Sequence, residues 1–100
     1  MEYDLDCRYD TRKSFYGKAR VLEQQFEKDL YSYGTLVAKI IEIPSKIKYI
    51  CYGKYSQTTT RHQKEFFRQN DLSEKEIKQL FKDGVLEIEK WSWKLMVLKS

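Results

Sequence analysis

A strand that leads directly into a helix is predicted between Lys46 and Asn70, and this pair limits the possible folds more than any other segment. Apolar and polar side chains alternate from Lys46 to Tyr55, which is the pattern of a strand with one buried face. A hydroxyl-rich hinge, Ser56–Thr60, follows, and then a helical pattern that runs to about Asn70. The two elements favour a fold in which helices pack on a sheet.

The hinge offers several residues that could begin this helix. Thr60 has capping-box spacing to Gln63, and Ser56 and Thr58 are alternative caps. Each of these hydroxyls could accept a hydrogen bond from the free N–H groups of the first turn. At the other end, Asn70 can terminate the helix in a left-handed conformation.

The predicted helix has one face for the core and one for the solvent. The residues expected to face the core are His62, Phe66, Phe67 and Gln69. Arg61, Lys64 and Arg68 follow each other at i, i+3 and i+7 and therefore form a basic face, which Glu65 interrupts. The basic face is the clearest candidate binding feature of the chain, although such faces are usually only solvated.

Three further strands are predicted before this pair. The alternating or β-branched runs are Glu2–Tyr9, Lys18–Gln24 and Leu30–Ile43. Gln24–Asp29 is polar and is expected to be a connection. Pro44–Ser45 is expected to be the turn of a hairpin.

A second helix and one or two C-terminal strands complete the predicted fold. Ser73 is the expected cap of this helix with Glu76 at capping-box spacing, and Asp83–Gly84 ends it. Strand patterns follow in Val85–Lys99. The order of elements predicts a single α+β domain, an antiparallel sheet of four to six strands with two helices packed on one face.

Length and composition restrict the class of protein. One hundred residues, of which 41% are hydrophobic and 15% aromatic, suffice for one domain with a core. The formal charge of +4 permits contact with nucleic acid or an acidic protein and argues against a DNA mimic. Two cysteines are no disulfide framework, and Cys7 and Cys51 are expected to be reduced thiols in a cytosol. The start, MEYDLDC, lacks the apolar run of a signal peptide.

Catalytic and metal-binding patterns are weak. Cys7, Cys51 and His62 lack metal-ligand spacing, and a Cys51–His62 dyad would need an exposed thiol of lowered pKa. Asp4 and Asp6 share the expected solvent face of a strand, and the glycines form no phosphate-binding loop. We therefore expect no enzyme, no metal and no cofactor.

Binding of a macromolecule is the better-supported class. Basic residues could hold nucleic acid by charge, and Tyr31, Tyr33, Tyr52 and Tyr55 could stack on its bases if they are exposed on the sheet. Tyrosine, tryptophan and arginine are equally the residues of protein-interface hot spots. The residues expected to contact a partner are Arg61, Lys64, Arg68, Tyr52, Tyr55, Trp91 and Trp93.

Three segments together resemble a known family. They are YDTRKSFYGKA (Tyr9–Ala19), LYSYGTLVAKI (Leu30–Ile40) and YSQTTTRHQKEFFRQ (Tyr55–Gln69). They are similar to short, uncharacterised proteins of bacteriophages and other mobile elements of Gram-positive bacteria, in which an S-Y-x-T-x-V-A strand precedes a Y-S-x-T-T-x-R-H helix start. Here these motifs are Ser32, Tyr33, Thr35, Val37 and Ala38, then Tyr55, Ser56, Thr58, Thr59, Arg61 and His62. The similarity ends near Asn70.

The resemblance implies a phage-encoded protein that acts in the cytoplasm of a bacterial host. We expect a stoichiometric inhibitor of a bacterial defence system, of the anti-CRISPR type, that contacts a host protein or ribonucleoprotein complex. The alternative is a small nucleic-acid-binding accessory protein that uses the basic helix face. Salt distinguishes the two, because affinity for phosphates falls steeply as salt rises.

Overall fold

The computed structural model describes residues 1–11, 14–44, 46–53, 55–82 and 87–91, and of residues 82, 87, 88, 90 and 91 it describes the backbone. The elements in chain order are β1 (Glu2–Asp4), β2 (Ala19–Gln24), β3 (Glu27–Ser32), β4 (Thr35–Ile43), β5 (Lys46–Cys51), α1 (Gln57–Gln69), α2 (Glu74–Lys82) and β6 (Glu87–Trp91).

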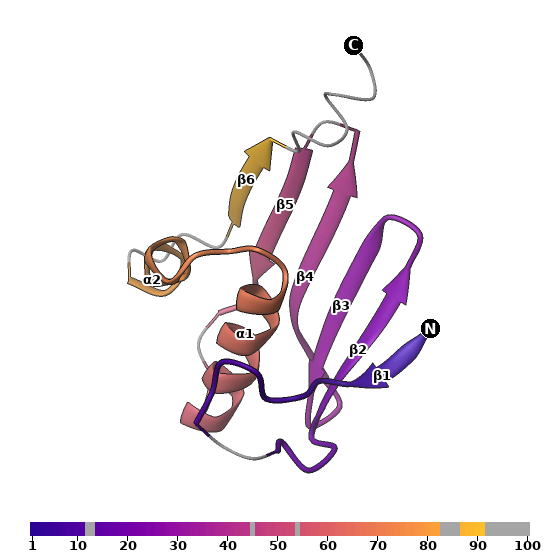
Figure 1. Cartoon of the computed structure of the whole chain (residues 1–100), viewed down its shortest axis with the longest axis vertical. Coiled ribbons are helices and arrows are strands. Elements are labelled where there is room, and N and C mark those ends of the chain that lie inside the picture. The colour runs from indigo at the N-terminus through magenta and orange to yellow at the C-terminus, as the bar shows by residue number, and fades with distance from the viewer. Residues whose placement is uncertain (12–13, 45, 54, 83–86, 92–100) are drawn as a thin grey trace.

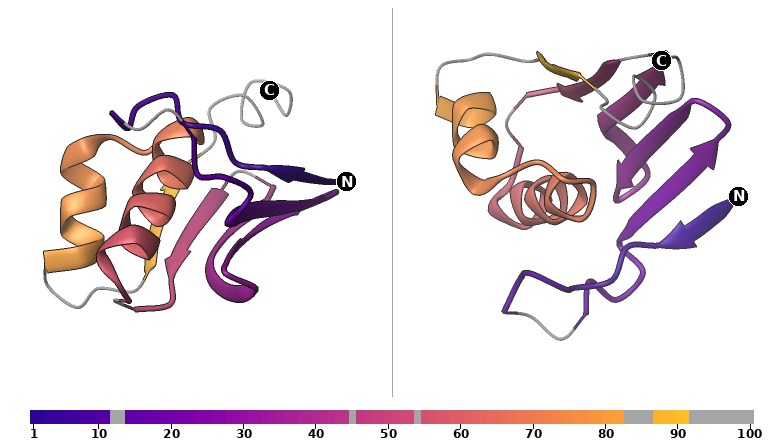
Figure 2. Two further views of the ribbon diagram at one scale, coloured as in Figure 1. Left: turned by 90° about the horizontal axis from the view of Figure 1, so that it is seen from below. Right: turned by 45° about the horizontal axis from the view of Figure 1, so that its top comes forward.

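The six strands form one antiparallel sheet in which each strand pairs with its neighbour in the chain, in the order β1-β2-β3-β4-β5-β6. Figure 1 shows α1 lying against the sheet and α2 beside α1, close to β6. Figure 2 shows both helices on the same side of the sheet. The predicted α+β class, with two helices on one face of an antiparallel sheet, is confirmed.

The predicted strand Leu30–Ile43 is wrong, because a tight turn divides it into β3 and β4. Ser32 pairs with Thr35, and both turn residues have positive φ angles, 51° for Tyr33 and 82° for Gly34. These angles are those of a two-residue type I′ hairpin. The usual sequence pattern for a type I′ turn is Asn-Gly or Asp-Gly. Here the first turn residue is a tyrosine, so the pattern did not indicate a turn.

Other predicted boundaries are also wrong. The expected connection Gln24–Asp29 contains only a short turn, and β3 begins already at Glu27, so five strands precede the helices rather than four. The first strand ends at Asp4 instead of Tyr9, because the chain then leaves the sheet edge and crosses toward α1. The strand predicted to reach Tyr55 ends at Cys51.

The core lies between α1 and one face of the sheet. Its largest buried side chains from the sheet include Leu30, Ile40 and Tyr49, and α1 contributes Phe66 and Phe67. The Tyr49 hydroxyl donates to the Asn70 carbonyl at 2.8 Å, which joins β5 to the end of α1. The alternation in Lys46–Cys51 therefore predicted the buried face of this strand correctly.

Helix α1 begins earlier than Thr60. Ser56 is the cap, and its Oγ accepts a hydrogen bond from the Thr59 N–H at 3.2 Å. Gln63 does not complete a capping box, because its Nε2 donates across the core to the Val37 carbonyl at 3.0 Å and the Gly53 carbonyl at 3.2 Å. At the other end, Asp71 rather than Asn70 has the left-handed φ, at 70°.

The predicted capping box of α2 is confirmed. The Glu76 N–H donates to Ser73 Oγ at 3.2 Å, and the Ser73 N–H donates to Glu76 Oε1 at 3.1 Å. The hairpin predicted around Pro44 is also present, with β4 and β5 antiparallel on either side of it. The predicted end of α2 at Asp83–Gly84, and the part of the last predicted strands beyond Trp91, lie outside the described residues.

Charged residues on the sheet are arranged in pairs. Arg20 of β2 contacts Glu2 at 2.8 Å and Asp4 at 2.6 Å, both on the acidic strand β1. Lys39 lies 3.2 Å from Glu27 and 3.9 Å from the Asp29 carboxylate. Asp29 is only 6% exposed, and burial, followed by the neighbouring Glu27, raises its pKa to about 6.

Asp29→Asn should stabilise the protein near neutral pH. A carboxyl whose pKa is raised in the folded state contributes stability while it is protonated. For Asp29 this contribution is lost as the pH rises through about 6. At pH 7.5 we expect the asparagine variant to raise the free energy of unfolding by about 1–2 kcal/mol, since one pKa unit corresponds to about 1.4 kcal/mol. Urea denaturation at a series of pH values would measure this. The difference should vanish between pH 6 and pH 4, and the exposed Asp6→Asn variant should show no such gain.

Candidate functional site

The basic face of α1 lines a hollow between α1, α2 and the N-terminal loop. Its volume is about 330 Å³. Arg61, Lys64 and Arg68 all contribute to it, which confirms that they lie together on one face. The other lining residues are Tyr9, Asp10, Glu65, Glu74, Ile77 and Lys78. This hollow is hereafter the helix groove.

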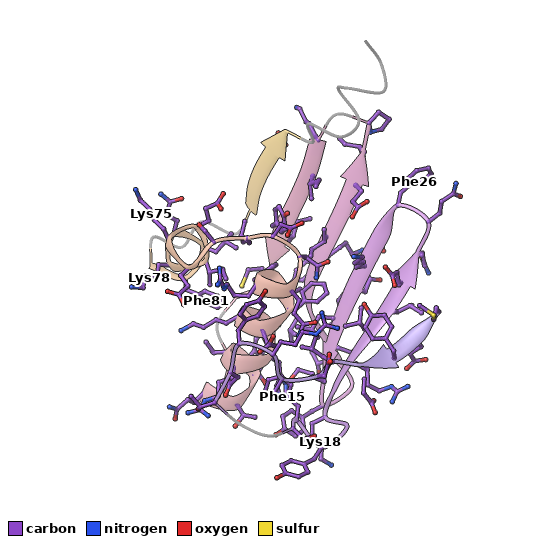
Figure 3. All side chains as sticks on the ribbon, viewed as in Figure 1. Phe15, Lys18, Phe26, Lys75, Lys78 and Phe81 are labelled. Atoms are coloured by element: carbon purple, nitrogen blue, oxygen red, sulfur yellow. The ribbon has the colours of Figure 1, made fainter. Side chains whose placement is uncertain are left out.

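Two cations of the helix groove lie over aromatic rings. The Arg68 guanidinium carbon is 4.7 Å from the centre of the Tyr9 ring, and Lys64 Nζ is 5.9 Å from the centre of the Phe81 ring. Figure 3 shows Phe81 on the side of α2 that faces α1. Attraction between a cation and a ring face contributes roughly 0.5–1 kcal/mol per pair at exposed sites, and it restrains the long cationic side chain.

The sequence predicted that Glu65 interrupts the basic face. This is wrong at the surface, because the Glu65 side chain is only 2% exposed. Its Oε1 accepts hydrogen bonds from the Tyr9 and Asp10 N–H groups, both at 2.9 Å. Its Oε2 accepts from Gln69 Nε2, which also donates to the Asp6 carbonyl. Glu65 therefore anchors the loop that forms one wall of the helix groove.

Four cations and three carboxylates line the helix groove, which leaves a small excess of positive charge. Arg61 Nη1 lies 3.9 Å from the Asp10 carboxylate, which is a long ion pair. Within the part of the chain that the structure describes, no carboxylate lies within 4 Å of the Lys64, Arg68 or Lys78 cations. Because the Glu65 carboxylate is buried against the loop, a ligand in the groove has little access to it.

The remaining predicted contact residues lie elsewhere. Tyr52 and Tyr55 are exposed in the connection between β5 and α1 and do not line the helix groove; the Tyr55 hydroxyl donates to the Tyr52 carbonyl at 3.4 Å. The Trp91 backbone pairs with Lys46 at the end of β6, and its side chain lies outside the described part. Trp93 also lies outside the described residues. A role of these four residues in partner binding stays a prediction.

A second hollow of about 630 Å³ is lined by residues of β1, β2 and β3 and of the turns at Gly17 and Gly34. Tyr31, Tyr33 and Leu22 contribute its apolar walls, together with the glycines of two turns. Its arginine, Arg20, already contacts Glu2 and Asp4. Tyr31 and Tyr33, two of the tyrosines predicted to stack on bases, thus do not line the helix groove.

Two residues considered for nucleophilic chemistry are buried. His62 Nδ1 shares a hydrogen bond of 2.8 Å with Ser32 Oγ, and its ring packs against Phe15 at 4.5 Å. The Cys51 thiol donates to the Gly53 carbonyl at 3.6 Å, and burial raises its pKa. A raised pKa disfavours the thiolate that a nucleophile requires. Both residues contribute to the core.

The described residues contain no group of three or more His, Cys, Asp or Glu side chains placed to hold a metal ion. Neither α1 nor α2 is long and apolar enough to cross a membrane.

The fold and the groove define a small α+β protein with a cationic hollow between its two helices. The chain belongs to DUF8033, a family of unknown function, whose model matches residues 3–84. The match includes α2, so the family extends beyond Asn70, where the resemblance in the sequence ended. Comparisons with curated proteins and with solved structures gave no match.

Glu65→Ala should release the N-terminal loop and destabilise the fold. Removal of the acceptor leaves two backbone N–H groups without their partner, which we expect to lower the free energy of unfolding by about 2–3 kcal/mol. Glu65→Gln keeps an acceptor oxygen and should cost about half as much. Denaturant unfolding measures both, with the exposed Glu74→Ala as control. Amide exchange at Tyr9 and Asp10 should accelerate in Glu65→Ala, and unchanged exchange there would refute the anchoring role.

Proposed function

We propose that this protein is a non-enzymatic binding protein that engages a protein partner stoichiometrically through the helix groove. The observation that supports this proposal is the set of cations in the groove, Lys64, Arg68 and Lys78, which have no carboxylate within 4 Å among the described residues. Exposed Tyr9 beside them adds a residue type that is common in interface hot spots. A surface of this kind is complementary to an acidic patch on another protein.

The partner in this proposal is a bacterial host protein or a ribonucleoprotein complex, and binding inhibits a defence system in the manner of an anti-CRISPR protein. The support for this part is the resemblance of the Ser32–Ala38 and Tyr55–His62 motifs to proteins of phages and mobile elements. A stoichiometric inhibitor needs a binding surface and no catalytic residues. The site of action is then the bacterial cytoplasm.

A nucleic-acid-binding accessory protein is the second candidate function. Arg61, Lys64 and Arg68 on one helix face are residues that could contact phosphates. Against it, Tyr31 and Tyr33, two of the tyrosines predicted to stack on bases, line a separate hollow. The two candidates differ in their salt dependence, which is steeper when several phosphates are neutralised.

Capture of a partner from a bacterial lysate tests the proposed function. We expect the tagged protein to retain a discrete host protein after nuclease treatment. The double variant Lys64→Glu, Arg68→Glu should lose this protein, because both reversed charges lie in the helix groove. Lys75→Glu, a single charge reversal on the exposed surface of α2 outside the groove, should retain it. Titration of the purified partner should then reach saturation at a fixed molar ratio.

Two outcomes would contradict the proposal. Loss of all captured material on nuclease treatment would favour the nucleic-acid function. Equal capture by the double variant, with its fold confirmed by circular dichroism, would move the partner surface away from the helix groove, toward Tyr52 and Tyr55 or the C-terminal tryptophans.

A further inference from the structure

We propose that Arg68 receives a single side-chain carboxylate of the protein partner, and that the helix groove recognises discrete carboxylates rather than a nucleic-acid backbone. This inference rests on the proposed function and goes beyond it, because it names the recognised group and the residue that binds it. The cations of the helix groove could attract any anion. Two features favour a carboxylate over other anions: the contacts that orient Arg68, and the carboxylates that also line the groove.

The Arg68 side chain is oriented before a ligand arrives. Its guanidinium lies over the Tyr9 ring at 4.7 Å. The Tyr9 backbone is in turn held by the hydrogen bond that its N–H donates to the buried Glu65 carboxylate, at 2.9 Å. A planar guanidinium held over a ring keeps N–H donors at its edge, and two of them match the two oxygens of a carboxylate.

Arg68 is also available to a ligand. None of the described carboxylates lies within 4 Å of its guanidinium, whereas Arg20 on the sheet contacts two of them at 2.8 and 2.6 Å. Lys64 and Lys78 border the same groove from α1 and α2. They would add attraction to a carboxylate on Arg68 without competing for its geometry.

The size of the helix groove fits one or two side chains of a partner. Its volume of about 330 Å³ is near the lower end of the range of ligand pockets, roughly 300–1,000 Å³. The buried side chain of Ile77 is among the lining residues and offers apolar contact to the methylene groups of an aspartate or glutamate. An acidic loop that inserts one carboxylate would satisfy these dimensions.

The carboxylates of the helix groove disfavour a phosphodiester chain. Asp10 and Glu74 line the groove together with the cations, so a strand of regularly spaced phosphates laid across it would meet negative as well as positive charge. In addition, Arg68 already lies over the Tyr9 ring, the aromatic side chain on which a base in this groove could stack. A single carboxylate placed at Arg68 avoids both conflicts.

Titration of the intact protein with two anionic probes tests the inference. The probes are a capped hexaglutamate peptide and an oligothymidylate of matched charge, each followed by the NMR signal of the Arg68 side-chain Nε–H at physiological salt. We expect hexaglutamate to shift this signal in a saturable manner. The oligothymidylate should bind at least about tenfold more weakly, because its phosphates lie in the backbone and cannot turn away from Asp10 and Glu74, whereas the glutamate carboxylates lie at the ends of flexible side chains.

Conservative variants separate geometry from charge. Arg68→Lys keeps the charge but loses the paired donors, and we expect it to weaken hexaglutamate binding about tenfold. Tyr9→Leu should also weaken binding, since it removes the ring that orients Arg68, whereas Tyr9→Phe should preserve it. Lys78→Ala should weaken binding, and Lys75→Ala, on the same helix but not among the lining residues, should not.

The outcomes that overturn the inference are distinct from failure of the proposed function. Equal binding by wild type and Arg68→Lys, tighter binding of oligothymidylate, or no shift of the Arg68 signal with hexaglutamate would each refute it. If host-protein capture still required Lys64 and Arg68 in any of these cases, the proposed function would stand and the carboxylate assignment would fall.

Discussion

Helix α1 presents polar side chains to the core, and the hydrogen bonds that these side chains make determine how the helix sits on the sheet. His62 contacts Ser32 of β3, Gln63 donates to the Val37 carbonyl of β4, and Glu65 accepts from the N-terminal loop. A buried polar group is costly unless it is hydrogen-bonded, so these contacts fix the rotation of the helix as well as its position. Phe66 and Phe67 supply apolar burial, which is less directional.

The rotation of α1 has a direct consequence for the helix groove. With His62, Gln63 and Glu65 turned inward, Arg61, Lys64 and Arg68 must lie on the sides that face the loop and α2. The buried carboxylate of Glu65 holds the loop in place, and the loop brings Tyr9 over Arg68. One carboxylate thus contributes to stability and, through Tyr9, to the geometry of the proposed binding residue.

Charge is distributed unequally over the described part of the molecule. Arg20, Lys39 and Lys48 on the sheet each lie within 4 Å of at least one carboxylate, and such exposed pairs contribute at most about 1 kcal/mol each. The cations of the helix groove have fewer partners of this kind. This difference, more than the net charge of +4, marks the groove as the candidate surface for an anionic partner.

The sequence by itself determined the α+β class, the buried face of Lys46–Cys51, the capping box of α2 and the basic face of α1, since each follows from local periodicity or cap chemistry. The tertiary structure alone decided the tyrosine-containing turn between β3 and β4 and the burial of Glu65. The Glu65 contacts join residues more than fifty positions apart, at Tyr9 and Asp10. No local pattern encodes a hydrogen bond at that separation, because the chain must first fold to bring its two partners together.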